Sequence, residues 1–184
     1  IFDQVIVAVA ANEGKKPLFN IDERYELVRA AVRELPNVSA DRLDGLLGSV
    51  AALISVPSGA EVAIAAALGS AADAVAVTGL DAAVAAFDHL KAEDLGRAGL
   101  LLGGDAGPDT TAWPELPGAA RYASRMIECA PTLRPAIERL LFKVAVVDDL
   151  AEGRRLVADL PEVTAVTLDG DVLSAWFAAG GSSS

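Results

Sequence analysis

The groups of residues best suited to chemistry are small and incomplete. Gly103-Gly104-Asp105-Ala106-Gly107 follows an apolar run, as phosphate-binding loops do, but it has no Lys-Ser/Thr pair. Pro108 also stands where a helix N-terminus would have to donate N–H groups to a phosphate. Asp169-Gly170-Asp171 lacks the further ligands and the terminal Glu of a calcium-binding loop. We therefore expect a connector at the first site and a hairpin turn at the second.

The remaining reactive side chains have no suitable neighbours in the sequence. His89, the only histidine, falls off the apolar face of its predicted helix, so we expect it to be exposed. Cys129 has no second cysteine for a zinc site and is interpreted as a small hydrophobic residue. Asp148-Asp149 precedes a helix, where negative charge suits the N-terminal dipole. The sequence thus predicts no catalytic group, no metal site, no cofactor and no small-molecule ligand.

Composition narrows the class of protein. The 184 residues are 53% apolar, which is enough for a buried core. Their net charge of −11 argues against strong binding to the phosphates of nucleic acid, which requires clustered cations. The longest apolar runs are far shorter than the roughly 20 residues of a membrane span, and no signal peptide is visible. A single cysteine fits a reducing compartment. We expect a cytoplasmic protein without membrane contact.

The elements of the first 44 residues form one unit. A β-branched apolar run at residues 2–11 predicts a buried strand. Asn20 and Glu23 have the spacing of a capping box, and the helix that they begin should end before Pro36. A second strand is expected at residues 37–40. Two strands cannot form a core alone, so this unit should be less protected than the rest or dock on it.

A second series of elements follows from Gly48 onward. Ser58 with Glu61 and Thr78 with Asp81 are predicted to cap two helices. The second of these helices should carry one apolar face made of Leu80, Val84, Phe87 and Lys91. Strands are predicted at residues 50–56, 74–77, 98–102, 144–147, 163–168 and 172–176. Helices are predicted at residues 133–142 and from the Asp149/Glu152 cap to Pro161, and residues 103–117 should be an exposed loop.

Residues 1–47 resemble phosphopantetheine adenylyltransferase. The resemblance rests on Phe2-Asp3-Gln4-Val5-Ile6-Val7-Ala8-Val9-Ala10, Lys15-Lys16-Pro17-Leu18-Phe19, Asp22-Glu23-Arg24 and Leu35-Pro36-Asn37-Val38. It implies that Lys15 or Lys16 contacts substrate and that the backbone near Leu46 and Leu47 contacts the pantetheine arm. The family's phosphate-binding Gly-His element would lie before Ile1, and its later arginine segment has no counterpart after Leu47. Catalysis by this segment is therefore not expected.

Residues 45–184 resemble the hinge domain of structural maintenance of chromosomes (SMC) proteins. The ordered series is Gly48-Ser49-Val50-Ala51-Ala52-Leu53-Ile54, residues 66–75, Leu90-Lys91, Gly96-Arg97-Ala98, Leu133-Arg134-Pro135-Ala136, Val146-Val147-Asp148-Asp149 and Val166-Thr167-Leu168-Asp169-Gly170-Asp171-Val172. The resemblance implies two mixed α/β lobes, here residues 45–102 and 118–184, that dimerise through strand edges assisted by glycines. The expected interface residues are Val163, Thr164, Val166, Leu168, Gly170, Val172, Gly180 and Gly181.

Together these observations predict a mixed α/β (α+β) fold. A two-lobed, hinge-like domain at residues 45–184 follows a partial Rossmann-like strand–helix–strand segment at residues 1–44. The expected function is homodimerisation in chromosome condensation and segregation, with weak DNA contact through residues that the sequence does not identify. The parent protein would be a nucleoid-associated ATPase, but this chain carries no ATPase head and should not be an enzyme. The alternative is an inactive fragment of the adenylyltransferase.

Overall fold

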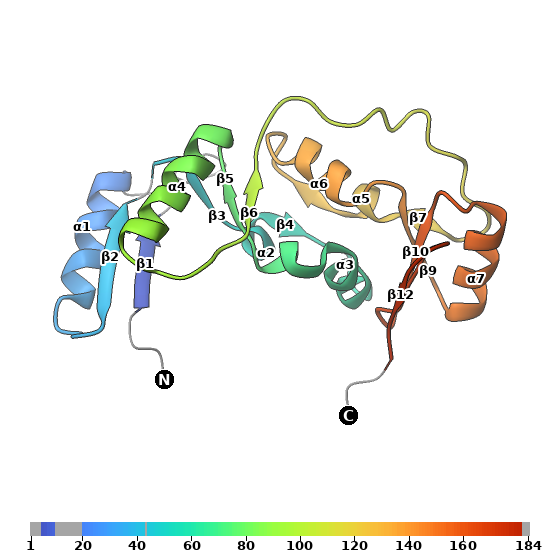
Figure 1. The fold of residues 1–184 in the computed structure, drawn as a ribbon, viewed down its shortest axis with the longest axis horizontal. Helices are drawn as coiled ribbons and strands as arrows, with labels where there is room; N and C mark the ends of the chain where they lie inside the picture. The colour runs from blue at the N-terminus through green and yellow to red at the C-terminus, as the bar shows by residue number, and fades with distance from the viewer. Residues whose placement is uncertain (1–4, 10–19, 43, 182–184) are drawn as a thin grey trace.

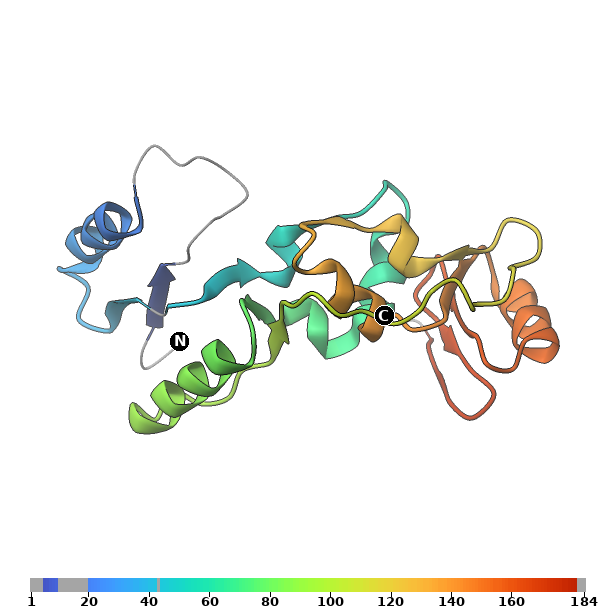
Figure 2. The same cartoon turned by 90° about the horizontal axis from the view of Figure 1, so that it is seen from above.

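A computed structural model describes residues 5–9, 20–42 and 44–181. Figures 1 and 2 show an elongated molecule, with the first two strands and helix α1 at one end and a five-stranded sheet at the other. A three-stranded sheet and its helices lie between them. The described chain contains both helices and strands, packed on one another, which confirms the predicted mixed α/β class.

The N-terminal unit has the predicted strand–helix–strand order. β1 (Val5–Val9) pairs in parallel with β2 (Val38–Arg42), and α1 (Ile21–Val32) connects them. The predicted capping box is confirmed: the Glu23 amide donates to Asn20 Oδ1 at 2.9 Å, and the Asn20 amide donates to Glu23 Oε2 at 2.8 Å. Yet α1 buries none of its residues, so it adds little apolar stabilisation to this unit.

The middle sheet has the strand order β3-β5-β6. β3 (Leu46–Ser49) runs antiparallel to β5 (Val75–Val77), which is parallel to β6 (Leu100–Leu102). Side chains alternate between the two faces of β5, as the pleat requires. Val77 packs with Leu46 and Ala83 on the face covered by helix α4 (Leu80–Ala92), whereas Ala76 faces a larger core.

The predicted strand at residues 50–56 is wrong. Ser49 accepts the Ala52 amide through its hydroxyl at 3.3 Å and caps a one-turn helix, α2 (Val50–Leu53). Only β4 (Ile54–Ser55) is extended, and it pairs with β8 (Glu128–Cys129) from the far half of the chain. A serine cap within an apolar run therefore replaces most of the expected strand by a turn of helix.

Two of the predicted helix caps are also wrong. Residues 57–60 form a turn in which the Ala60 amide donates to the Pro57 carbonyl. α3 (Glu61–Leu68) therefore begins with Ala60 at its N-cap, and the Ser58 side chain does not cap it. α4 begins after Gly79, and no side chain accepts from its first turn. A short 3-10 helix, η1 (Gly69–Asp73), leads from α3 to β5. The spacing of the sequence matches a capping box at both sites, but the preceding turns decide where each helix starts.

α4 turns its small residues inward. Ala83 and Ala86 are buried against the sheet, whereas the expected core face of Leu80, Val84 and Phe87 is exposed. His89, which we expected to be exposed, lies half-buried on the inner side of the helix. Alanines allow close approach of a helix to a sheet, and this approach directs the bulky side chains outward.

The C-terminal sheet has the order β12-β11-β10-β9-β7. Parallel strands β9 (Val144–Val147) and β10 (Thr164–Thr167) are connected by α7 (Leu150–Asp159). β7 (Arg121–Tyr122), β11 (Val172–Leu173) and β12 (Ala178–Ala179) pair antiparallel to their neighbours. The predicted cap of α7 is confirmed, because Asp149 Oδ1 accepts the Glu152 amide at 2.8 Å. Short helices α5 (Ala123–Met126) and α6 (Arg134–Leu140) complete this half.

One core joins the two halves of residues 45–181. Ile64 and Leu68 of α3, Leu101 of β6, and Val146 and Val166 of the C-terminal sheet are buried in a single cluster. Helix α3 belongs to the first half in sequence but packs against β9 and β10 of the second half. The division into lobes at residues 45–102 and 118–184 stays a prediction, because the buried side chains on its two sides pack together.

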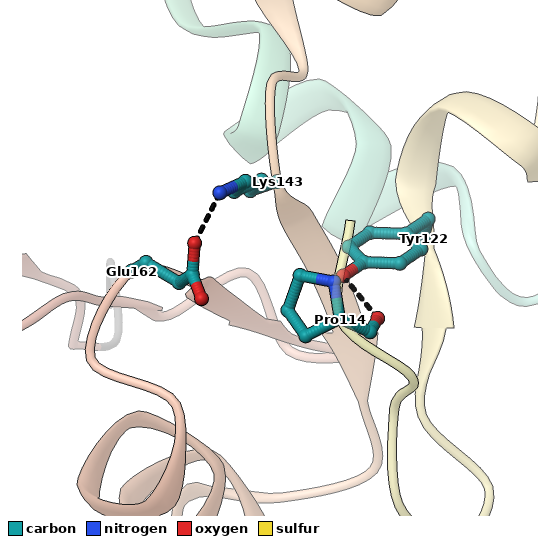
Figure 3. Close-up of polar contacts among 4 residues, drawn as sticks. All are labelled: Pro114, Tyr122, Lys143 and Glu162. Carbon is teal, nitrogen blue, oxygen red and sulfur yellow. Dashed lines mark hydrogen bonds and ion pairs between the residues drawn. The ribbon is translucent and has the colours of Figure 1, made fainter. Parts of the chain in front are cut away.

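The connector before β7 is attached to the fold by an aromatic side chain. Residues 103–117 contain no helix or strand, as expected, but Trp113 is only 7% exposed. Its ring packs edge-on against Tyr122, with centroids 4.8 Å apart, and against Phe142 at 5.4 Å. The Tyr122 hydroxyl donates to the Pro114 carbonyl at 2.8 Å, as Figure 3 shows. This connector is therefore part of the second core and not a free loop.

An ion pair lies beside this aromatic cluster. Lys143, immediately before β9, contacts the Glu162 carboxylate, which precedes β10 (Figure 3). The ion pair connects the N-terminal ends of the two parallel strands β9 and β10. Because Glu162 is exposed, we expect a contribution of at most about 1 kcal/mol.

We predict that Trp113→Ala strongly destabilises the fold. Removing a buried tryptophan leaves a cavity and releases the connector, which should lower the free energy of unfolding by about 3–5 kcal/mol in urea titrations. Leu150→Ala is the control, since Leu150 is 52% exposed on α7 and its loss should change the free energy by less than about 0.5 kcal/mol. Equal effects of the two substitutions would contradict the proposed role of Trp113.

Candidate interface at the edge of the C-terminal sheet

The outer edge of the C-terminal sheet begins with a hairpin. β10 and β11 pair antiparallel, and the Gly170 amide donates to Thr167 across the turn at 2.9 Å. Gly170 has a φ of +93°, a conformation that glycine adopts without strain. The predicted Asp-Gly hairpin turn is confirmed. The turn also packs closely on α3, because a Cβ on Gly170 would lie 3.1 Å from the Val62 side chain.

A further strand, β12, lies outside β11 and was missed by the sequence reasoning. The strand predicted at residues 172–176 ends at Leu173, and the chain turns back through residues 174–177. Ser174 makes this turn: its amide donates to the Phe177 carbonyl at 2.8 Å, and its hydroxyl accepts the Phe177 amide at 3.0 Å. Only two alanines form the new strand, which is too short for any periodic signal in the sequence.

Asp171 connects the three outer strands. Its Oδ1 accepts the Gly181 amide at 2.9 Å, and its Oδ2 accepts the Thr167 hydroxyl at 3.3 Å. The Thr167 hydroxyl accepts the Asp171 amide in return at 3.0 Å. A Cβ on Gly180 would lie 2.0 Å from Asp171 Oδ1, so a side chain at this position would displace the carboxylate from its bond to the Gly181 amide. The sequence analysis considered Asp171 only as a calcium ligand and missed this positioning role.

β12 pairs with β11 on one side only. On its other side, no described residue of the sheet pairs with its backbone N–H and C=O groups. The Ser174 amide donates to the Phe177 carbonyl, and the register then pairs Leu173 with Ala178 and Val172 with Ala179. Hydrogen-bonded and non-hydrogen-bonded pairs alternate in an antiparallel ladder, so the N–H and C=O of Ala178 point away from β11. Residues 178–181 are exposed. This edge is a template on which another strand can pair.

The structure places the expected interface residues in three groups. Val163 and Val166 are fully buried inside the chain, so they support the sheet from within. Thr164, Gly170 and Val172 are half-buried, and Leu168 is partly exposed. Gly180 and Gly181 lie on the exposed edge, and Gly181 has open space around its Cα. The edge itself, with Ala178 and Ala179, is the part that the sequence reasoning did not identify.

Of the residues implied by the adenylyltransferase resemblance, the structure describes Leu46 and Leu47. Lys15 and Lys16 lie outside the described residues. Leu46 is buried in the middle sheet, where it pairs with Val77, and Leu47 packs against the large core. Both leucines therefore belong to β3 of the middle sheet and stabilise the fold in this structure.

Arg134 and Cys129 have structural settings in the second half of the chain. The Arg134 guanidinium donates to the carbonyls of Ser124 at 2.7 Å and Ile127 at 2.6 Å. These two hydrogen bonds give Arg134 a structural role. Burial raises the pKa of the Cys129 thiol above its ordinary value, and Arg134 offsets this only in part. The thiol is therefore protonated near neutral pH and is a poor nucleophile.

The described ranges contain no group of three His, Cys, Asp or Glu side chains placed to bind a metal ion. Within the same ranges, no helix has both the length and the apolar character needed to cross a membrane.

Comparison with known proteins separates the chain into two parts. Its N-terminal quarter is similar to phosphopantetheine adenylyltransferases: it is 51% identical over 47 residues to that of Caldanaerobacter subterraneus, covering 26% of this chain and 29% of the enzyme. The Symbiobacterium thermophilum enzyme is 52% identical over 46 residues, covering 25% of this chain and 28% of the enzyme. These matches confirm the predicted similarity of the first segment.

The larger part is similar to chromosome partition proteins named Smc. That of Mycolicibacterium paratuberculosis is 49% identical over 138 residues, and that of Mycobacterium tuberculosis is 47% identical over 141 residues. Each match covers 75% of this chain but 12% of the relative, so the chain spans about an eighth of the length of these proteins.

Solved structures agree with these matches. The SMC hinge domain of Geobacillus stearothermophilus, described as an asymmetric dimer, superimposes with a TM-score of 0.64 at 32% identity, over 84% of this chain and 63% of that one. The Pyrococcus furiosus hinge, at a TM-score of 0.60 and 24% identity over 87% of this chain and 84% of that one, shares the fold. The family model described as the flexible hinge domain of SMC proteins matches residues 43–157. The chain therefore belongs to the family of SMC flexible hinge domains.

Proposed function

We propose that this chain is a homodimerisation module that acts in chromosome partition as the hinge of an Smc protein. The open edge of β12 is the observation that carries the proposal, because it exposes the N–H and C=O of Ala178 on a strand without an outer neighbour among the described residues. An edge of this kind is stabilised when a strand from another chain pairs with it. The Geobacillus stearothermophilus hinge is described as a dimer, which supports association of two copies.

A closed two-fold dimer satisfies this edge without further growth. Each contact then occurs twice, and no unpaired copy of the interface is left over. Gly180 and Gly181 suit such a contact, since the absence of side chains allows another backbone to approach closely. The internal hydrogen bonds of Asp171 hold the edge in shape before a partner arrives.

Other activities follow from the same family membership only as proposals. The hinge is a non-catalytic domain, and ATP turnover would belong to other parts of a longer Smc protein. DNA contact should be weak, in a dissociation-constant range of about 10⁻⁴–10⁻⁶ M, because the chain carries a net charge of −11 and Arg134 is committed to the fold. A cytoplasmic, nucleoid-associated location fits the relatives' role in chromosome partition.

We predict that Ala178→Pro weakens the dimer while leaving the fold intact. Proline removes the outward N–H but no hydrogen bond to β11. If each lost bond contributes about 1 kcal/mol and occurs twice, the dissociation constant should rise about 30-fold in sedimentation equilibrium.

Ala178→Val is the matched control, because it adds a side chain but keeps the N–H. It should dimerise like the unmodified chain. Equal dissociation constants for the proline variant and the unmodified chain, with β11 and β12 still paired, would rule out pairing at this edge.

We predict that Asp171→Ala loosens β12. The loss of hydrogen bonds to a charged acceptor should speed amide exchange at Gly181 by about 10-fold or more, measured by native-state hydrogen exchange. Asp169→Ala, in the same turn and exposed, should leave this rate unchanged. A Gly181 amide that exchanges equally slowly in both variants would show that Asp171 does not hold the edge.

A further inference from the structure

The outer side of α4 is an apolar surface that is exposed along its length. Leu80 is 68% exposed, Val84 is 51% exposed and Phe87 is 40% exposed. Their spacing places them on one side of the helix, together with Lys91, and the inner side already packs on β5 and β6 through alanines. We call Leu80, Val84 and Phe87 the α4 face. Such a contiguous row on an amphipathic helix indicates a contact that the single chain does not make.

A second exposed apolar group lies at the turn between β11 and β12. Trp176 is 74% exposed and Phe177 is 61% exposed, and we call this pair the aromatic tip. Ser174 fixes the turn: its hydroxyl accepts the amides of Phe177 at 3.0 Å and Trp176 at 3.4 Å and donates to the Phe177 carbonyl at 3.0 Å. The two rings are therefore presented on an ordered backbone, so little conformational entropy remains to be lost at this turn on binding.

The two surfaces cannot meet within one chain. Both views of the fold place α4 beside the middle sheet and β12 at the other end of the long axis (Figures 1 and 2). A two-fold arrangement of two copies that exchanges the ends of this axis places the tip of each chain beside the α4 of the other. The middle sheet also has open edges, at β3 and β6, to which β12 of a second copy could be added.

We propose that the aromatic tip of each copy packs on the α4 face of the second copy. This contact rests on the dimer proposed above and gives it a second, apolar component beside the strand edge. Tryptophan and phenylalanine side chains bury about 150–250 Å² each, so the two tips supply a large share of the roughly 1,600 Å² of a standard interface. Buried aromatic anchors of this kind dominate the affinity of many interfaces.

Cross-linking tests where the tip lies. In a Cys129→Ser background, Ala175→Cys places a thiol beside the tip, and Lys91→Cys places one on the α4 side without removing an apolar residue. Under mild oxidation, the double variant should form a disulfide-linked dimer. Arg154→Cys, on the exposed side of α7, combined with Ala175→Cys should give no linked dimer. A ladder of longer linked species would contradict the closed arrangement.

Affinity supplies the second readout. Two double variants are measured by sedimentation equilibrium: one removes the tip by Trp176→Ser with Phe177→Ser, and the other alters the α4 face by Leu80→Ser with Phe87→Ser. Each should raise the dissociation constant of the dimer at least about 30-fold. Leu150→Ser, at a similarly exposed leucine on α7, should have no effect. If the chain dimerises but neither pair weakens the dimer and no cross-link forms, the tip contact is refuted while the dimer stands. If the unmodified chain is monomeric, both proposals fail.

Discussion

The arrangement of the hinge depends on the packing of α3 against a sheet from the other half of the chain. Ile64 and Leu68 are buried in the same cluster as Val146 and Val166, and Leu133 and Ile137 close it from α6. The pairing of β4 with β8 adds backbone hydrogen bonds between the two halves, and the bonds from Arg134 to two carbonyls hold the second half together. Neither half can keep this cluster buried without the other. The C-terminal sheet is therefore held in a fixed position, and its outer edge is presented to solvent as a rigid surface.

The residues before this unit have a different physical character. α1 has a complete capping box and a parallel pair of strands beside it, yet it buries no residue. Local signals are enough to specify its secondary structure, but no described residue of β1, α1 or β2 belongs to the buried clusters of the hinge. The described part of the segment that is similar to an enzyme therefore adds nothing to these buried clusters. The surfaces able to recognise a partner lie in the hinge.

Sequence reasoning succeeded where short-range chemistry decides the structure. The caps at Asn20 and Asp149 and the turn at Gly170 were predicted because their side chains or φ values act within four residues. It failed where tertiary contacts decide. The outward face of α4 looked like core because periodicity shows that a helix has two sides but not which side packs. β12 was missed because two alanines form a strand only through pairing with β11 and the anchor at Asp171.

A hinge whose outer strand β12 has no outer neighbour among the described residues should associate with one second copy. Size-exclusion chromatography with light scattering on the unmodified chain tests it most directly. At micromolar concentration the account predicts one peak with twice the chain mass of 18.8 kDa, and this mass should not increase on further concentration because a closed two-fold contact leaves no free interface. A chain that keeps the monomer mass at high micromolar concentration, or whose mass grows steadily with concentration, would contradict it.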